Sequence, residues 1–285
     1  MAVKVVTDSI CAPSLQTAET LDITIVPINI HFGERIYQDL FEIEPERFYS
    51  ELVSASELPT TSIPSVERYF NSFKEILNNG GSVFCLTVTS ELSNSYNVAL
   101  QASKELPEAE ADRVLVFDSQ SAGAAAGLLA IEAAKLGQQG LGLSEIKEKI
   151  ECLVPNAKLV VMFDTLKYIE KSGRVGKVAA VAGDLFNVKP LIYINQGKTK
   201  FFGRARGKQQ AVKLILDEFM KDTMEAKNIR VAATHANAEV GLAPIINRVK
   251  KIIADAEIEI VPFTPAMGAH AGPGIIGIAY IYDQA

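Results

Sequence analysis

The chain has 285 residues, of which 48% are hydrophobic and 22% are charged, so it can build a sizeable core and is neither disordered nor fibrous. Its net charge of −6, without long basic runs, argues against a nucleic-acid partner. Cys11, Cys85 and Cys152 are too widely spaced for a zinc site or a disulfide scaffold and indicate free thiols. No apolar stretch approaches the ~20 residues of a membrane span, and Met1–Val6 leads directly into a strand pattern. We therefore expect a cytoplasmic protein.

In the first half of the chain, β-branched runs alternate with helical patterns. The predicted strands are Lys4–Thr7, Ile23–Ile30, Ser82–Val88 and Arg113–Phe117. Between them, Val66–Asn78 carries one apolar stripe at helical spacing, and the glycines that follow Asn79 predict its end. The alanine-rich segment Ser121–Leu136 predicts a buried helix.

The second half repeats this alternation. Its predicted strands are Lys158–Phe163, Pro190–Ile194, Ile229–His235, Glu257–Val261 and Ile276–Tyr282. Its predicted helices are Glu145–Leu153, Lys208–Met224 and Val240–Ala254. Several strands are apolar at consecutive positions, as in sheets that are covered on both faces. The sequence therefore predicts an α/β fold with mainly parallel or mixed sheets covered by helices, in two domains that span residues 1–155 and 156–285.

Two glycine motifs do not have the surroundings that a cofactor would require. The GxGxxG string Gly272–Gly277 precedes a strand rather than a long helix, which argues against a nicotinamide cofactor. Gly197–Thr199 resembles the end of a phosphate-binding loop, but Ile192 stands where the first glycine is needed, so a hairpin turn is expected. The three histidines have no metal-ligand spacing. We expect no metal and no cofactor.

Four segments concentrate small hydroxylated residues. They are Thr7–Ser9, Pro59–Ser65, Thr89–Tyr96 and Asp118–Gly123. Three of them follow predicted strands, and loops at the carboxyl ends of parallel strands converge on one ligand crevice. Each segment also begins a predicted helix, so helix capping and anion binding both remain open interpretations.

Two further segments could meet an anion. Gly268–Gly274 is rich in glycine and contains His270, which could donate a hydrogen bond, although an ordinary glycine turn is the alternative. Arg174 lies in the segment Lys171–Gly176 and offers a cation, although a solvated arginine after a helix is equally consistent.

In these residues the sequence resembles the DegV family of bacterial fatty-acid-binding proteins. The resemblance runs nearly from end to end, and it rests on the order and spacing of several short strings. They are Thr7–Ser9, Pro59–Ser65, Leu92–Tyr96, Asp118–Ser119, Tyr168–Val175, Lys189–Pro190 and Gly268–Gly277. The chain departs from the family pattern at Asn94-Ser95, Ile63 and Ser172, where Gly-Thr, Gln and Gly are usual.

The resemblance implies two α/β domains with a long-chain fatty acid in a tunnel between or beneath them. It implies that Thr61 and Ser93 hold the carboxylate, with His270 beside them and the Asn94 amide completing the site. It places Arg174 near the mouth or a partner surface. The remaining expected binding residues belong to the same segments and are Ser62, Gly268 and Ala269.

The favoured hypothesis is therefore a carrier without catalytic residues. Family resemblance implies that it binds a palmitate- or oleate-like acid and presents the carboxylate to a fatty acid kinase, which makes acyl phosphate for phospholipid synthesis. One alternative is a hydrolase or transferase that uses Ser93 or Ser119 with His270 as the base. A second alternative is a regulatory module that senses a small anion.

Overall fold

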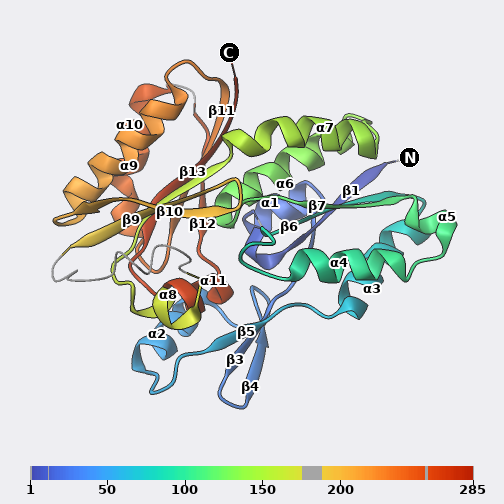
Figure 1. The fold of residues 1–285 in the computed structure, drawn as a ribbon, viewed down its shortest axis with the longest axis horizontal. Helices are drawn as coiled ribbons and strands as arrows, with labels where there is room; N and C mark the ends of the chain where they lie inside the picture. The colour runs from blue at the N-terminus through green and yellow to red at the C-terminus, as the bar shows by residue number, and fades with distance from the viewer. Residues whose placement is uncertain (1, 12, 175–187, 254–255, 285) are drawn as a thin grey trace.

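The structure is a computed structural model that describes residues 2–11, 13–174, 188–253 and 256–284. Strands and helices alternate along these segments (Figure 1). The strands are β1 (Val3–Asp8), β2 (Thr24–Val26), β3 (Asn29–Phe32), β4 (Arg35–Gln38), β5 (Thr60–Ser62), β6 (Ser82–Thr87), β7 (Val114–Asp118), β8 (Lys158–Met162), β9 (Lys189–Asn195), β10 (Lys198–Ala205), β11 (Lys227–His235), β12 (Ile258–Pro262) and β13 (Ile276–Asp283). The α-helices are α1 (Leu15–Thr20), α2 (Pro45–Ser54), α3 (Val66–Asn78), α4 (Ser95–Lys104), α5 (Glu108–Ala111), α6 (Gly123–Gln138), α7 (Leu143–Leu153), α8 (Lys167–Ser172), α9 (Lys208–Thr223), α10 (Ala243–Ile252) and α11 (Pro265–Ala271). Short 3-10 turns are η1 (Ser9–Cys11), η2 (Val154–Asn156) and η4 (Glu239–Leu242).

The first sheet consists of parallel strands in the order β2-β1-β6-β7. Its inner strand β6 is buried along its whole length because helices cover both faces. Val83 and Cys85 pack with α3 and α4, while Phe84 and Leu86 point to the opposite face and pack with α6. This two-sided burial explains why the strand is apolar at consecutive positions.

The second sheet is mixed and has the strand order β10-β9-β8-β13-β11-β12. The pair β11–β12 is parallel, and the other neighbours are antiparallel. Helices α9 and α10 cover one face, where Val160, Met162 and Ile278 form a core with Ile215 and Val249. The predicted α/β fold with parallel and mixed sheets is therefore confirmed.

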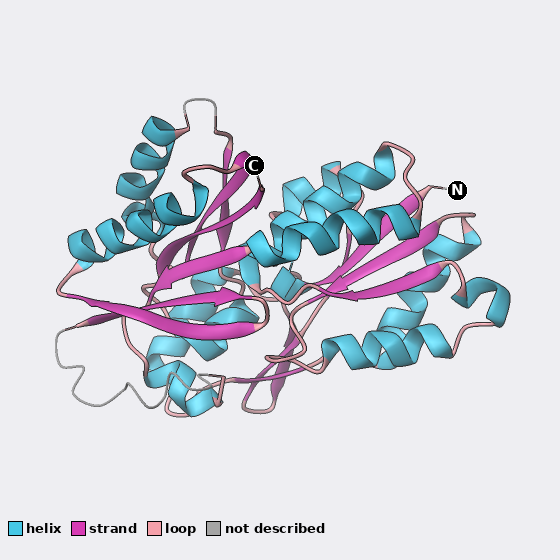
Figure 2. Ribbon diagram, turned by 45° about the horizontal axis from the view of Figure 1, so that its top comes forward, coloured by secondary structure: helices cyan, strands magenta, loops and turns pink. Residues whose placement is uncertain are grey.

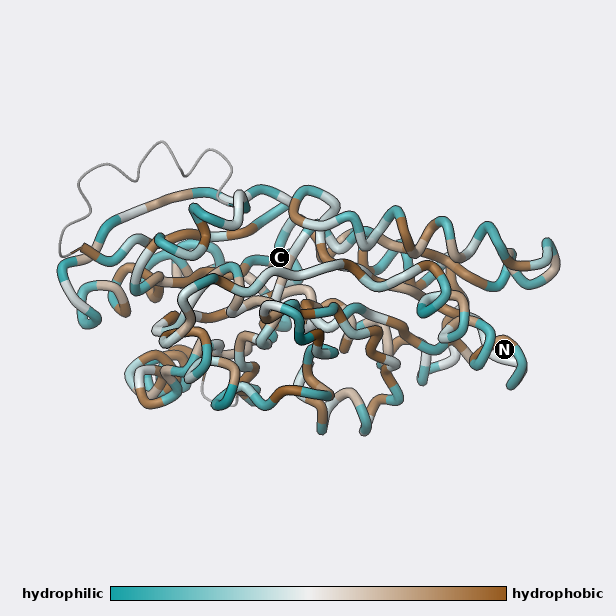
Figure 3. Tube along the Cα trace, turned by 90° about the horizontal axis from the view of Figure 1, so that it is seen from below, coloured by the Kyte–Doolittle hydropathy of each residue, from teal (hydrophilic) through white to brown (hydrophobic). Residues whose placement is uncertain are grey.

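Helix α6 lies between the two larger sheets, as Figures 1 and 2 show. It contacts β1 of the first sheet and both β11 and β13 of the second. Ala125, Ala126, Ala130 and Ala133 are fully buried, and their small side chains let both sheets approach the helix axis. Figure 3 shows how apolar and polar stretches alternate along the described residues. Because one hydrophobic cluster includes residues from both halves, the domain boundary at residue 155 stays a prediction.

The predicted strand Ile23–Ile30 is wrong as a single element. It is divided into β2 and β3, which belong to different sheets. Pro27 lies at the break, where its missing N–H prevents a continuous ladder. Strand β3 pairs antiparallel with β4 and with β5, so part of the predicted loop Pro59–Ser65 is a strand.

The first part of the glycine-rich segment Gly268–Gly274 is helical and not the ordinary turn that was the alternative interpretation. Pro265–Ala271 forms α11, which Thr264 caps by accepting a hydrogen bond from the Met267 amide at 3.4 Å. The string Gly272–Gly277 then leads into β13, so a strand and not a helix follows it, as the sequence predicted.

The predicted helices agree with the structure at most of their ends. Val66–Asn78 has the same bounds as α3, and α6 and α9 lie within two residues of their predictions. The predicted helix Val240–Ala254 is η4 followed by α10, and Ala254 lies outside the described residues. All three cysteines are free, with Cys11 and Cys85 buried and Cys152 exposed.

Strands β9 and β10 form the predicted hairpin. Gln196 and Gly197 have φ values of +48° and +72°, the positive pair that a tight two-residue turn needs. The Gly197 amide donates to the carbonyl oxygen of Gln120, in the loop before α6. The Asn195 side chain donates to the carbonyl oxygen of Pro155 at 2.9 Å. These bonds attach the hairpin tip to the first half of the chain.

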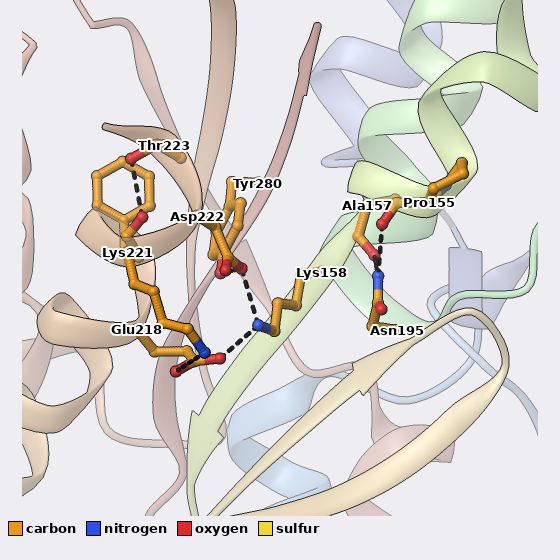
Figure 4. A network of polar contacts seen from close by, with 10 residues as sticks. Pro155, Ala157, Lys158, Asn195, Glu218, Lys221, Asp222, Thr223 and Tyr280 are labelled. Atoms are coloured by element: carbon orange, nitrogen blue, oxygen red, sulfur yellow. Dashed lines mark hydrogen bonds and ion pairs between the residues drawn. The ribbon is translucent and has the colours of Figure 1, made fainter. Parts of the chain in front are cut away.

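Behind this hairpin, a charged network is buried between β8 and α9 (Figure 4). The Lys158 ammonium donates to the carboxylates of Glu218 and Asp222, the latter at 2.8 Å. The Tyr280 hydroxyl also donates to Asp222, at 2.7 Å, and the Tyr193 ring centroid lies 4.2 Å from the ammonium. Burial alone lowers the pKa of Lys158, but its hydrogen bonds to the two carboxylates outweigh burial and raise it above its usual value.

Candidate ligand-binding site

A cavity of about 410 Å³ lies where the carboxyl ends of the first sheet meet the inner face of the second. Ile10, Val88 and Ala122 follow β1, β6 and β7 and close one side of the cavity. The walls are mostly apolar, and the polar side chains that reach the cavity are Thr61, Ser93, Asn94, Arg174, Thr199 and His270.

The second sheet supplies a flat apolar wall through strand alternation. Leu159 and Val161 on β8 lie opposite Ile194 and Ile192 on β9, and all four side chains line the cavity. The residues between them on β8 point to the core beneath α9. Because successive side chains of a strand point to opposite faces, one strand serves both surfaces.

At the polar end, β5 and α11 bring together Thr61 and His270. The Thr61 hydroxyl lies 2.7 Å from Nε2 of His270. Burial, reinforced by the nearby positive charge of Arg174, lowers the pKa of His270 to about 4, so the imidazole is neutral at pH 7. In the tautomer with the proton on Nε2, His270 donates to Thr61, and the Thr61 hydroxyl proton is then free for an anion.

Among the described residues, none orients His270 as a general base is oriented. Its buried Nδ1 has no hydrogen-bond partner within the described residues, whereas a catalytic histidine is normally oriented by a third group. The Ser93 hydroxyl bonds to the Ser95 hydroxyl at 2.9 Å, and His270 bonds to Thr61. The pair Ser93–His270 considered for a hydrolase is therefore not formed in this structure.

Ser93 and Asn94 enter the cavity from the start of α4. The Ser93 hydroxyl accepts a hydrogen bond from the Ser95 backbone amide at 3.2 Å, and the Asn94 side-chain oxygen accepts from Nδ2 of the Asn97 side chain at 2.6 Å. Both side chains are oriented by their own helix while they face the cavity. Their arrangement suits a group that accepts hydrogen bonds.

Arg174 lies just after α8 and connects the cavity with the outside. Gly173 ends the helix with φ of +71°, and the Arg174 guanidinium donates to the Ser172 carbonyl at 2.6 Å. A second cavity of about 430 Å³ shares Thr61, Arg174 and His270 with the first. The polar end therefore lies next to an outer pocket that contains exposed Lys171 and Arg174.

Three of the expected binding residues lie beside the cavity rather than on its wall. The Ser62 hydroxyl faces away, 2.8 Å from Nε2 of His31, because neighbouring strand residues point to opposite sides. Gly268 packs on Phe48 and Tyr49, whose atoms would lie within 2.8 Å of an added Cβ. Ala269 lines the outer pocket and not this cavity.

In two of the hydroxylated segments, Thr7–Ser9 and Asp118–Gly123, the polar side chains brace loops and do not line the cavity. Asp8 accepts hydrogen bonds from the amides of Ile10, Cys11 and Val88, yet burial still raises its pKa to about 6. Ser119 donates to the carbonyl oxygen of Ser121 and is fully buried. Asp8 and Ser119 therefore bond to the backbone of nearby loops, and no side chain of the described residues caps α6.

Within the described residues, no cluster of three or more His, Cys, Asp or Glu side chains could hold a metal ion. A helix long and apolar enough to cross a membrane is likewise absent from the part of the chain that the structure describes. The fold and the site together define an α/β protein with a mostly apolar cavity that is polar at one end.

The chain belongs to the DegV family, since the family model described as "Uncharacterised protein, DegV family" matches residues 2–283. A structure of a fatty-acid-binding DegV family protein from Thermus thermophilus matches with a TM-score of 0.91 and 27% identity, covering 99% of this chain and 100% of that chain. A stearic-acid-binding protein from Eubacterium ventriosum matches with a TM-score of 0.87 and 29% identity, over 98% of both chains. A fatty acid-binding protein from Thermotoga maritima is 29% identical over 286 residues, 97% of this chain and 96% of that protein.

Proposed function

We propose that the protein binds one long-chain fatty acid, with the acyl chain in the apolar cavity and the carboxylate at its polar end. The observation that carries this proposal is the cavity itself, where long apolar walls meet the hydrogen-bonded pair of Thr61 and His270. A fatty acid has the same division into an apolar chain and one anionic group.

Thr61, Ser93 and the Asn94 amide are proposed to hold the carboxylate as neutral donors, with His270 behind Thr61. A neutral imidazole suits this role because the Thr61 hydroxyl can pass the hydrogen bond on to the ligand. The acyl chain would supply most of the affinity. At about 0.8 kcal/mol per buried methylene, the roughly 14 methylenes of palmitate represent about 11 kcal/mol before the costs of binding are subtracted.

The outer pocket supports the finer proposal that the carboxylate is presented to a fatty acid kinase. Thr61, Arg174 and His270 border both cavities, so a carboxylate held there lies next to the opening. Exposed Lys171 and Arg174 would favour the approach of an anionic phosphate donor. The product would be an acyl phosphate for phospholipid synthesis.

Native and denaturing mass measurements on protein purified without detergent test the binding proposal. We expect a stoichiometric fatty acid that is released on denaturation. The double variant Thr61→Ala/Ser93→Ala should lose it, whereas Ser62→Ala should retain it because that hydroxyl faces His31. Wild-type protein that is empty and takes up neither palmitate nor oleate would overturn the proposal.

The kinase proposal needs a separate assay. Loaded protein is mixed with ATP and a bacterial fatty acid kinase, and acyl phosphate is trapped with hydroxylamine. We expect Arg174→Ala to keep its lipid but to form less acyl hydroxamate than wild type. Equal product from both proteins would remove Arg174 from this role.

A further inference from the structure

Helix α11 carries both a head-group residue and part of the wall around the acyl chain. Met267, His270 and Ala271 are three and four residues apart, so they share one face of the helix, and all three line the cavity. The helix therefore links the polar end of the site to its apolar interior.

The backbone of α11 is fixed from several sides. The Tyr49 hydroxyl donates to the carbonyl oxygen of Phe263 at 3.2 Å, and the carboxylate of buried Asp39 accepts from the Ala266 amide at 3.0 Å. At Gly272, an added Cβ would lie 2.2 Å from the Tyr168 ring. A helix held so tightly cannot shift to fit different ligands, so any adjustment must come from its side chains.

Met267 is the side chain on this face best suited to adjust. It is unbranched and has a polarisable thioether, which lets it fill irregular spaces. Its side chain lies over Gly123, the first residue of α6, where an added Cβ would come within 2.8 Å of the Met267 methyl carbon and 3.3 Å of Leu159. The space that Met267 occupies therefore exists because residue 123 has no side chain.

We propose that Met267 determines which acyl chains the cavity accepts, and that Gly123 sets how far the Met267 side chain projects into it. The inference rests on the proposed fatty-acid ligand. With Gly123 beneath it, the thioether can lie back against α6 and leave room for an 18-carbon chain. A side chain at position 123 would push the thioether toward the acyl chain, and loss of the thioether would enlarge the cavity.

The first experiment measures chain preference directly. Delipidated wild type, Met267→Ala, Met267→Phe and Met267→Leu are each offered an equimolar mixture of myristate, palmitate, stearate and oleate, and the bound acids are identified by mass spectrometry. Each buried methylene changes affinity about fourfold, and Met267→Ala makes room for about two more of them. We therefore expect this variant to raise the ratio of 18-carbon acids to myristate about 16-fold. Met267→Phe should lower this ratio, and Met267→Leu, which nearly conserves volume, should leave it close to wild type.

The second experiment tests the contact between Gly123 and Met267. Gly123→Ala should shift binding toward myristate, and Gly123→Ala/Met267→Ala should restore the 18-carbon acids because the displaced thioether is gone. Gly123 has φ of +56°, so Gly140→Ala is the matched control for backbone strain, with φ of +88° and no atom near its added Cβ. This control should lose stability but keep the wild-type ratio.

The outcomes separate the two proposals. If wild type binds none of the four acids, the proposed function fails. If wild type binds them but the ratio stays within twofold in Met267→Ala and Met267→Phe, or moves in the opposite direction, the role of Met267 is overturned. Failure of the second alanine to restore the ratio would overturn the role of Gly123.

Discussion

Replacing Lys158 with methionine should destabilise the fold strongly. The Lys158 side chain is 9% exposed, and its two carboxylate partners, Glu218 and Asp222, are 13% and 18% exposed. The substitution removes the cation and leaves two neighbouring carboxylates on α9 away from water. Breaking a buried ion pair from one side costs about 3–5 kcal/mol of unfolding free energy, and we expect a loss in that range.

Lys221 provides a matched control, since it contacts the same carboxylate. Its ammonium lies 3.8 Å from Glu218, but its side chain is 72% exposed. Surface pairs of this kind contribute about 0.2–1 kcal/mol, so Lys221→Met should change the unfolding free energy by less than about 1 kcal/mol. Both variants remove one positive charge beside Glu218, so the difference between their losses of unfolding free energy measures the effect of burial.

Urea unfolding of delipidated protein at pH 7 gives both free energies, provided the m-value stays constant. Lowering the pH should narrow the gap between Lys158→Met and wild type, because protonation removes the uncompensated carboxylate charge. Adding Glu218→Gln and Asp222→Asn should recover much of the loss at pH 7. The reasoning is refuted if Lys158→Met costs no more than Lys221→Met, or if neutralising both carboxylates has no effect.

Three further outcomes follow from the site and the hairpin. Thr61→Val keeps the shape but removes the hydroxyl, so the affinity for palmitate should fall by about 5–100-fold in a titration, and an unchanged affinity would exclude Thr61 as a carboxylate ligand. His270 should titrate at a pKa of about 4 by NMR. Because an unfolded histidine has a higher pKa, the stability of the wild type relative to His270→Gln should fall by about 2–3 kcal/mol as the pH drops from about 6.5 to about 4. Parallel stability profiles of the two proteins over this pH range would contradict the low pKa. Gly197→Ala should lower the melting temperature more than Gly207→Ala. Both glycines have positive φ, but a Cβ at position 197 would also lie 3.0 Å from the Thr89 hydroxyl, whereas one at position 207 would meet no atom within 4 Å. Equal losses would show that backbone strain alone accounts for the effect.

The sequence predicted most accurately those elements in which the apolar periodicity and the residues typical of helix ends indicate the same bounds. Helix α3 combines an apolar stripe with a Ser65 cap that accepts from the Arg68 amide, and its predicted bounds match the structure. Helix α11 gave no such pattern, because its small residues show no apolar periodicity and the glycines from Gly268 to Gly274 left a turn open as an alternative. It forms because Tyr49, Tyr168 and Asp39 pack on it or bond to it from distant parts of the chain.

The site was predicted at the level of segments, and the structure distinguishes individual side chains within them. Thr61 and Ser62 are neighbours, yet only Thr61 faces the cavity, and a three-residue strand is too short for its alternation to be read from sequence. The apolar wall residue Met267 carried no signal, since a lone methionine in a glycine-rich segment looks like any small buried contact. Its position depends on α6, which lies far away in the sequence.

Strand β8 has a consequence for how this protein tolerates change. Its backbone is paired on both sides, with β9 and with β13, and a single layer of chain separates the cavity from the core beneath α9. On one face of this strand Val160 packs in the core beneath α9, and on the other Leu159 and Val161 line the cavity and also belong to the core that includes α6. Substitutions at Val160 are therefore constrained by a single protein core, while those at Leu159 and Val161 must satisfy both the packing around α6 and the shape of the cavity.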